Sequence, residues 1–321
     1  MNMQHIRHSV ACELAHTETI ITKHIDSNVS LLNDVKNNII VSGGKRLRPL
    51  LLLLSAKACG YSGNDNTHLA AVIELIQTAT LLHDDVIDNS DLRRGNPTAN
   101  SLWDNTIAIL SGDFLYAKSF QIMLDHASRK IMHLLTNTYS TIVEGEMIQL
   151  LSAKNSDMTE AEYYTIIGAK TAQLFATAAK IGAMLAESEH ADALQQFGKH
   201  FGLAFQLIDD LLDYVGKSDA HLGKKLGDDL EEGKVTLPII YALQHATATE
   251  QEVIKKALSN GNRNVLNSVA AILHSSGAIA YTAECAQKEI QLALAAIANL
   301  PETTASLALQ KLARYLGERS F

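Results

Sequence analysis

Apolar residues follow a helical pattern along most of the chain. Between residues 69 and 87 they cover nearly the whole circumference of a helix, which predicts a helix buried on most sides. The chain has 4 prolines, and none lies between Pro97 and Pro238. Because proline inside a helix costs about 3 kcal/mol, this interval predicts stacked long helices. No extended alternation of β-branched and aromatic residues indicates strands, so we expect an all-α bundle of roughly a dozen helices.

Two acidic motifs interrupt this apolar pattern. Each has the sequence DDxxD within an otherwise apolar helix. At about 100° per residue, the first and last aspartates of a motif lie about 40° apart on one face of the helix, one turn removed. The motifs consist of Asp84, Asp85 and Asp88 in the first and of Asp209, Asp210 and Asp213 in the second. The spacing therefore predicts two clusters of carboxylates, each directed to one side of its helix.

Carboxylates that are crowded together and partly withdrawn from water need a cation to neutralise them. Aspartate oxygens are hard ligands, and two of them with retained waters suit a Mg²⁺ ion that also bridges to a phosphate group. The HExxH pattern of zinc proteases is absent. A solvated acidic face explains one motif as well as a metal does, but two motifs in apolar helices favour the metal. We therefore expect Mg²⁺ together with a diphosphate ligand.

Basic residues stand near both acidic motifs. The segment GGKRLRP concentrates three cations just before an apolar stretch, where the free N–H groups of a helix start also attract phosphate. Arg93 and Arg94 directly follow the first motif, and Lys170, Lys224 and Lys234 come later in the chain. Neither a P-loop nor a GxGxxG motif is present. These clusters predict two separate sites for phosphate groups.

Composition and charge narrow the class of protein. Hydrophobic residues make up 47% of the chain and charged residues 19%, which is enough for a large core. The net charge of −8 argues against nucleic acid as the main partner. The 3 cysteines are far apart and fit a reducing compartment rather than a disulfide framework. Without a signal-like N-terminus or a run of 18 apolar residues, we expect a cytoplasmic protein with no transmembrane anchor.

The motifs GGKRLRP, LLHDDVIDNSDLRRGNPTAN, GDFLYAKSF and FQLIDDLLDY resemble, in their order and spacing, the trans-polyprenyl diphosphate synthase family. The resemblance implies a single all-α isoprenoid synthase domain over residues 1–321, built around a central cavity and usually a homodimer. It implies a long-chain trans-prenyltransferase that uses Mg²⁺ to ionise an allylic diphosphate, such as farnesyl diphosphate, and adds successive isopentenyl diphosphates. The implied product is octaprenyl diphosphate for quinone side chains.

Carried over position by position, the resemblance implies a role for residues in both halves of the site. Asp84, Asp88 and Asp209 are the implied catalytic aspartates, which hold Mg²⁺ on the allylic diphosphate; Asp85 and Asp213 join the metal set and Asp210 supports it. Isopentenyl diphosphate is the implied ligand of Lys45, Arg48, Gln77 and Arg94. The allylic diphosphate is the implied ligand of Arg93, Lys170, Thr171, Gln206, Lys224 and Lys234.

Product length in such a family depends on the depth of an apolar tunnel below the first motif. Ala79 and Thr80 lie five and four residues before Asp84, about 6–8 Å along the helix. Both are small at a place where short-chain family members often carry bulky aromatic residues, which favours a long product. Phe120 and Met123 are candidates for a deeper part of the wall, with ordinary core packing as the other interpretation of each.

Two other functions fit the same fold. A terpene cyclase or head-to-head synthase would use the acidic motifs, but the cation cluster of GGKRLRP favours a second substrate, isopentenyl diphosphate. A non-catalytic subunit of a heteromeric synthase tends to lose aspartates or arginines, whereas both acidic motifs are complete here. Consumption of isopentenyl diphosphate by the purified single chain distinguishes chain elongation from both alternatives.

Overall fold

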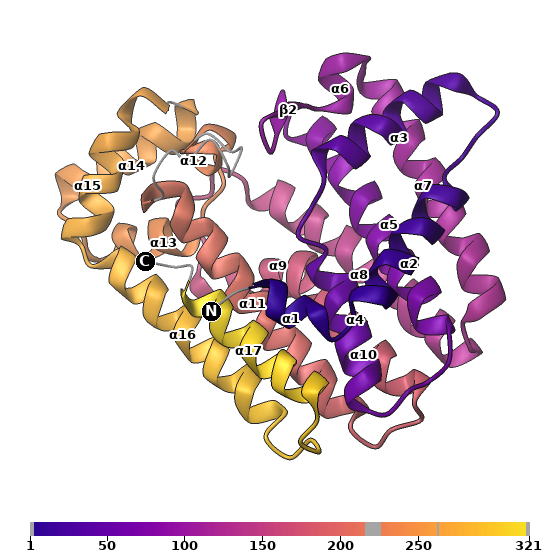
Figure 1. The fold of residues 1–321 in the computed structure, drawn as a ribbon. Coiled ribbons are helices and arrows are strands. Elements are labelled where there is room, and N and C mark those ends of the chain that lie inside the picture. Colours follow the sequence, from indigo (N-terminus) through magenta and orange to yellow (C-terminus); the bar gives the residue numbers. More distant parts are fainter. Residues whose placement is uncertain (1–2, 216–225, 262, 319–321) are drawn as a thin grey trace.

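The computed structural model describes residues 3–215, 226–261 and 263–318, which form helices joined by short loops (Figure 1). The all-α prediction is confirmed. More helices are present over these residues than the dozen expected, because several are short. The elements are α1 (Met3–His8), α2 (Ala11–His24), α3 (Ser30–Ser42), α4 (Leu47–Ala58), α5 (Asp65–Ile87), β1 (Leu92–Arg93), β2 (Asn96–Pro97), α6 (Ala99–Leu102), α7 (Asn105–His126), α8 (Arg129–Ser152), α9 (Glu160–Ile167), the π-helix η1 (Gly168–Ala172), α10 (Gln173–Leu185), α11 (Ala191–Val215), α12 (Asp228–Glu232), α13 (Leu237–His245), α14 (Ala248–Asn260), the 3₁₀ helix η2 (Arg263–Val265), α15 (Leu266–Ser275), α16 (Ala278–Ala296) and α17 (Thr304–Glu318).

A small hairpin follows the first acidic motif. Strands β1 and β2 pair antiparallel, with Leu92 opposite Pro97 and Arg93 opposite Asn96. The sequence pattern did not predict these strands, because two residues are too few to show an alternation of apolar and polar positions. The hairpin brings Arg93 and Arg94 back toward the end of α5 and thereby determines where these two cationic side chains lie.

The centre of the bundle consists of α4 and α5. The five leucines Leu50–Leu54 of α4 have no exposed surface, and α4 packs against α5, α10 and α17. Residues along the first half of α5, such as Leu69 and Ile73, are also fully buried. Helices that are apolar on all sides belong in the interior, so the prediction of a buried helix is confirmed for residues 69–76, whereas Ile87 at the end of the helix is 38% exposed. The last turn of α5 then brings the first acidic motif out of this core.

Two glycines allow α11 to lie very close to the π-helix and α10. A Cβ added at Gly198 would come within 2.4 Å of the Phe175 carbonyl oxygen, and one at Gly202 within 2.5 Å of the Ala172 Cα. Side chains four residues apart share one face of a helix, so this pair forms one flat contact surface. The close approach places the second acidic motif, which follows on α11, beside η1.

The helices after residue 226 form no separate unit. Figure 1 shows α12 to α15 gathered at one end of the molecule, while α16 and α17 run back along it. Helix α16 packs extensively against α11, and α17 packs against α4 and α1. Because these contacts join the C-terminal helices to the central ones, the bundle has one continuous core.

Helix α7 is, among the described residues, the one that is long and apolar enough to cross a membrane by length and composition. Its most apolar 18-residue window is 44% buried inside the bundle. The helix packs along α5 through more contacts than any other pair of helices makes. Packing of this extent is typical of a core helix in a globular protein.

Candidate active site

A cavity of about 800 Å³ opens between the ends of α5 and α11. Both acidic motifs line it, together with residues of α4, α8, η1 and the hairpin. The predicted site residues that the structure brings together here are Asp84, Asp85, Asp88, Asp209, Asp210 and Asp213, Lys45, Arg48, Gln77 and Arg94, and Arg93, Lys170, Thr171, Gln206 and Lys234. Lys224 lies outside the described residues. Residues more than 150 positions apart in the sequence therefore share one cavity, as the two motifs predicted.

The first and last aspartates of the first motif each face a lysine from another part of the chain. Asp84 Oδ2 lies 4.0 Å from Lys170 Nζ, and Asp88 Oδ2 accepts a hydrogen bond of 2.9 Å from Lys234 Nζ. Burial raises the pKa of Asp84 to about 6, and the neighbouring Glu146 and Asp88 act in the same direction against Lys170. The carboxylates are thus costly to keep charged without a nearby cation.

Lys170 lies on the π-helix η1 and is held by two residues of α8. Its ammonium group is 2.5 Å from Glu146 Oε2 and donates a 2.7 Å hydrogen bond to Gln149 Oε1. Sequence reasoning missed Glu146 and Gln149. Their signal was a polar pair three residues apart, on one face of the apolar stretch of α8. Short π-helical segments frequently occur at functional sites, and this one directs Lys170 into the cavity.

Asp85 has a different environment from its neighbours. It is 4% exposed, its Oδ1 accepts a 2.8 Å hydrogen bond from Arg93 Nε, and Arg93 Nη2 lies 2.7 Å from the same oxygen in an ion pair. Burial raises the pKa of Asp85, and the Arg93 guanidinium opposes that rise. This ion pair ties the hairpin to α5, so Arg93 is fixed at the edge of the cavity.

Asp210, on the second motif, lies at the centre of a hydrogen-bonded group. Its carboxylate accepts 2.6 Å hydrogen bonds from the Tyr163 hydroxyl and from Gln206 Nε2. The Gln206 Oε1 atom in turn accepts a 2.8 Å hydrogen bond from Thr171. Burial and the nearby Asp229 raise the pKa of Asp210 to about 7, while its two donors lower it. The network connects η1 with α11 and orients both toward the cavity.

Asp213 accepts hydrogen bonds from the main chain at the start of α12. The backbone N–H groups of Gly227, Asp228 and Asp229 all lie 3.2 Å from its two oxygens. An acidic side chain at a helix N-terminus satisfies N–H groups that have no partner within the helix. Asp213 therefore fixes the segment that leads to Lys234. Asp209 lines the cavity and is partly buried.

The three cations of GGKRLRP have different environments. Arg46 is bound to Glu18, at 2.6 Å, and to Glu74, at 2.5 Å, so it anchors the segment to α2 and α5. Arg48 lies with its guanidinium carbon 4.0 Å from the Phe175 ring centroid, and burial lowers its pKa to about 10. Lys45 and Arg94 are exposed at the mouth of the cavity. The Arg94 guanidinium donates a hydrogen bond to the Gly43 carbonyl.

Part of the cavity lining is apolar. Tyr116 and Tyr139, with ring centroids 4.5 Å apart, belong to it together with Ile142, Val143 and Met147 of α8. The four residues predicted for the tunnel wall differ in burial and in whether they line the cavity.

Thr80 lines the cavity, as predicted. Ala79 is fully buried in the core, because it lies about 100° around the helix from Thr80. Met123 is 6% exposed and is also part of the core, whereas Phe120 is 40% exposed. None of Ala79, Met123 and Phe120 lines the cavity of the single chain, and their places in a deeper part of the tunnel wall stay predictions.

This geometry defines a class of protein. Hard carboxylate oxygens, several cations and a set of apolar side chains line the same cavity. Such an arrangement suits an all-α enzyme that acts on a diphosphate attached to an apolar chain.

Comparison with known proteins identifies the family. Residues 29–274 match the model of the polyprenyl synthetase family. The chain is 41% identical over 322 residues to octaprenyl diphosphate synthase of Escherichia coli, covering 99% of each protein. It is 42% identical over 318 residues to a geranyl-diphosphate-specific all-trans-nonaprenyl-diphosphate synthase of Rhodobacter capsulatus, covering 98% of each.

A solved structure resembles the whole chain as well. Polyprenyl synthase of Caulobacter crescentus, in complex with calcium and isoprenyl diphosphate, superposes with a TM-score of 0.96 at 36% identity. The superposition covers 100% of this chain and 98% of that one. The chain belongs to the polyprenyl synthetase family, and it is a prenyltransferase.

Proposed function

We propose that this chain is a long-chain trans-prenyltransferase that extends farnesyl diphosphate, or a similar allylic diphosphate, with successive isopentenyl diphosphates to octaprenyl diphosphate. One observation carries the proposal: a single cavity has both a charged lining of carboxylates and cations and an apolar lining of aromatic and aliphatic side chains. A growing prenyl diphosphate has the same two parts. The Escherichia coli relative is an octaprenyl diphosphate synthase, which supports the eight-unit product. Such a product supplies the side chain of quinones such as ubiquinone.

The proposed metal ligands are Asp84, Asp88 and Asp209. Their hard oxygens suit Mg²⁺, and the calcium ion in the Caulobacter crescentus structure supports a hard divalent cation. The raised pKa of Asp84 fits a site that needs extra positive charge. When bound, Mg²⁺ supplies charge that stabilises the departing diphosphate. Asp85 and Asp213 take a supporting role in this proposal, because Arg93 and backbone N–H groups already engage them.

The proposed substrate sites use the cations on two sides of the aspartates. Lys170, with Thr171 and Gln206 beside it, binds the allylic diphosphate, and Lys234 joins it on the side of Asp88. Arg48, Lys45, Arg94 and Gln77 bind isopentenyl diphosphate near the start of α4. Arg93 fixes Asp85 and lies between the two groups. Cations that are already in place stabilise new negative charge without reorganisation.

The proposed reaction breaks the allylic carbon–oxygen bond, and the electron pair leaves with the diphosphate. Lys170 and Lys234 lie where negative charge grows on that leaving group. The double bond of isopentenyl diphosphate attacks the allylic cation and forms the new carbon–carbon bond. A proton then leaves the added unit to restore a double bond, and the released diphosphate accepts it. The apolar wall formed by α7 and α8 excludes water from the cation.

The test of the function is product analysis with the purified chain. With farnesyl diphosphate, radiolabelled isopentenyl diphosphate and Mg²⁺, we expect chromatography to resolve labelled products that end at eight isoprene units. Omission of the divalent ion, or its removal with a chelator, should abolish the labelled products. Turnover of farnesyl diphosphate without use of isopentenyl diphosphate would instead favour a cyclase. A chain that is inactive alone, yet active with a second protein, would favour a subunit of a heteromeric synthase.

The proposal includes a homodimer, for which α7 offers a surface. Leu110 and Leu124 of this helix are 55% and 67% exposed, and Phe120 between them is 40% exposed. Leu110, Ala117 and Leu124 are spaced by seven residues, so they lie along one face of the helix. Large exposed apolar patches often mark protein–protein interfaces. This face also explains why an apolar residue such as Phe120 is exposed in a single chain.

We expect the double substitution Leu110→Arg/Leu124→Arg to convert the dimer into a monomer, because it would bury four unpaired charges at a symmetric interface. Light scattering coupled to size-exclusion chromatography measures the mass. The matched control is Leu292→Arg/Leu307→Arg on α16 and α17, where the leucines are 39% and 37% exposed. A dimer that survives the α7 substitutions, or that the control disrupts equally, would remove α7 from the interface.

The proposal also places the enzyme in the cytoplasm. Cys12, Cys59 and Cys285 are all free, as expected in a reducing compartment. The packing of α7 against α5 supports its assignment as a core helix rather than a membrane anchor.

A further inference from the structure

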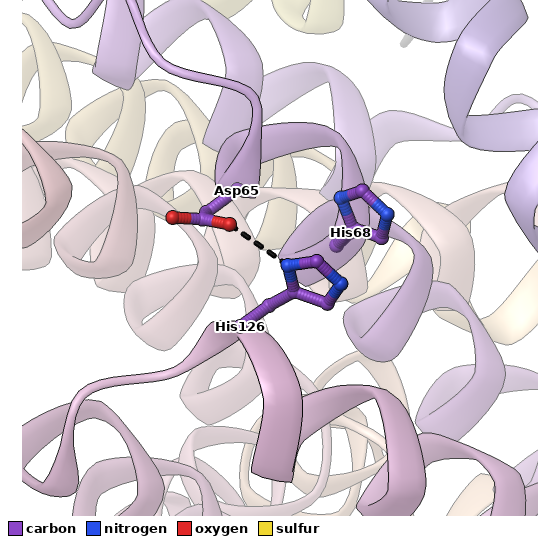
Figure 2. A group of neighbouring side chains, drawn as sticks. All are labelled: Asp65, His68 and His126. Carbon is purple, nitrogen blue, oxygen red and sulfur yellow. Dashed lines mark hydrogen bonds and ion pairs between the residues drawn. The ribbon is translucent and has the colours of Figure 1, made fainter.

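A second group of possible metal ligands lies far from the cavity. Asp65 is the first residue of α5, His68 lies one turn later, and His126 is the last residue of α7. One ligand atom from each of these residues lies within 4.8 Å of the other two (Figure 2). Asp65 and Asp84 are 19 residues apart on α5, which is about 28 Å along the helix. This group is therefore separate from the diphosphate chemistry.

Hydrogen bonds hold each side chain of the group in place. Asp65 Oδ1 lies 2.8 Å from His126 Nδ1, and Figure 2 shows the carboxylate directed at that ring. The two imidazole rings stack with centroids 3.5 Å apart. His68 Nδ1 lies 3.3 Å from the Asn64 carbonyl oxygen, so a proton on Nδ1 leaves the Nε2 lone pair for a metal ion.

A further residue lies beside this group of side chains. The ring of His16, from α2, lies edge-on at 6.0 Å from that of His68. Ligating side chains are commonly oriented by such outer partners. His16 is the nearest candidate for a fourth ligand.

We propose that Asp65, His68 and His126 bind a divalent transition-metal ion, with Zn²⁺ as the representative. Two imidazoles and one carboxylate, with positions left for a further ligand, form a set typical of Zn²⁺ and other first-row metals. The set differs from the all-oxygen ligands of the proposed Mg²⁺ site. Because α5 and α7 are far apart in sequence at these ends, the ion would cross-link the N-terminal end of α5 to the C-terminal end of α7.

Titration calorimetry with ZnCl₂ tests the site, using the full chain without a histidine tag and with Mg²⁺ in large excess. We expect the Zn²⁺ stoichiometry of the wild type to exceed that of His68→Gln/His126→Gln by one ion per chain. The single variants Asp65→Asn and His126→Gln should each weaken this binding by about tenfold or more. The matched control, His133→Gln, removes an exposed histidine of α8 and should bind as the wild type does.

X-ray absorption at the zinc edge of the wild type provides a measurement that needs no variant. We expect the scattering signature of two imidazole ligands. Zn²⁺ should also raise the Tm of the wild type and of His133→Gln, and leave that of His68→Gln/His126→Gln unchanged. Equal stoichiometry in the wild type and the double variant, or a spectrum with oxygen ligands alone, would overturn the site. Neither result would affect the test of prenyl transfer.

Discussion

We expect Asp84→Asn and Asp209→Asn each to lower the rate of prenyl transfer by about a thousandfold or more. Asparagine has nearly the same shape as aspartate but lacks the negative charge that holds a divalent ion. The two residues lie on different helices and line one cavity, so both contribute to a single charge cluster. Single-turnover assays with farnesyl diphosphate and labelled isopentenyl diphosphate, at increasing Mg²⁺, measure the loss.

Loss of folding would not explain this result for Asp84. Burial raises the pKa of Asp84 in the folded state to about 6, so above that pH the charged carboxylate destabilises the fold. Asparagine removes this charge, and at pH 7 the Tm should stay the same or rise. Far-UV circular dichroism should be unchanged.

The matched control for these two variants is Asp192→Asn, on the same helix as Asp209. The Asp192 side chain is 89% exposed and faces Lys180 on the surface. This variant should keep the wild-type rate. If Asp84→Asn and Asp209→Asn both turned over at the wild-type rate, the metal assignment would be wrong.

The fold could be predicted well from the sequence, because long apolar helices have a period that is visible without any structure. The leucines of α4 and the first half of α5 are examples, since they are apolar on all sides and lie in the core. Periodicity does not distinguish a core face from a face that meets another chain. Phe120 shows this, because its side chain is apolar and yet 40% exposed in the single chain.

The cavity residues could be predicted as a set but their individual partners could not. Spacing within DDxxD places Asp84 and Asp88 on one face, and both do line the cavity. Glu146 and Gln149 are absent from that prediction, because their contact with Lys170 joins helices that are distant in sequence. Likewise, only the path of the chain near Gly227 brings backbone N–H groups to Asp213. Tertiary contacts of this kind have no local signal.

A tyrosine at position 80 is expected to shorten the product. Thr80 lies four residues before Asp84, on nearly the same face of α5, and lines the cavity. The prenyl chain grows away from the diphosphate along this wall, so the added ring would meet it after a few units. Overpacking costs about 1–3 kcal/mol, which corresponds to a factor of about 5 to 150 against longer chains. Chromatography of the products should show the eight-unit fraction reduced by this factor.

The rate of the first addition separates a shorter tunnel from a damaged site. Thr80→Tyr should leave that rate nearly unchanged with dimethylallyl diphosphate, whose single isoprene unit ends before the new ring, and should lower it with farnesyl diphosphate, whose three units reach past the ring. Thr136→Tyr, an exposed position on α8, adds the same ring outside the cavity and should leave the product distribution intact. Ala79→Tyr, in contrast, should lower the Tm, since Ala79 has no exposed surface and the larger ring would overpack the core. A wild-type distribution from Thr80→Tyr would mean that the growing chain leaves Asp84 along another wall, past Tyr116 and Tyr139.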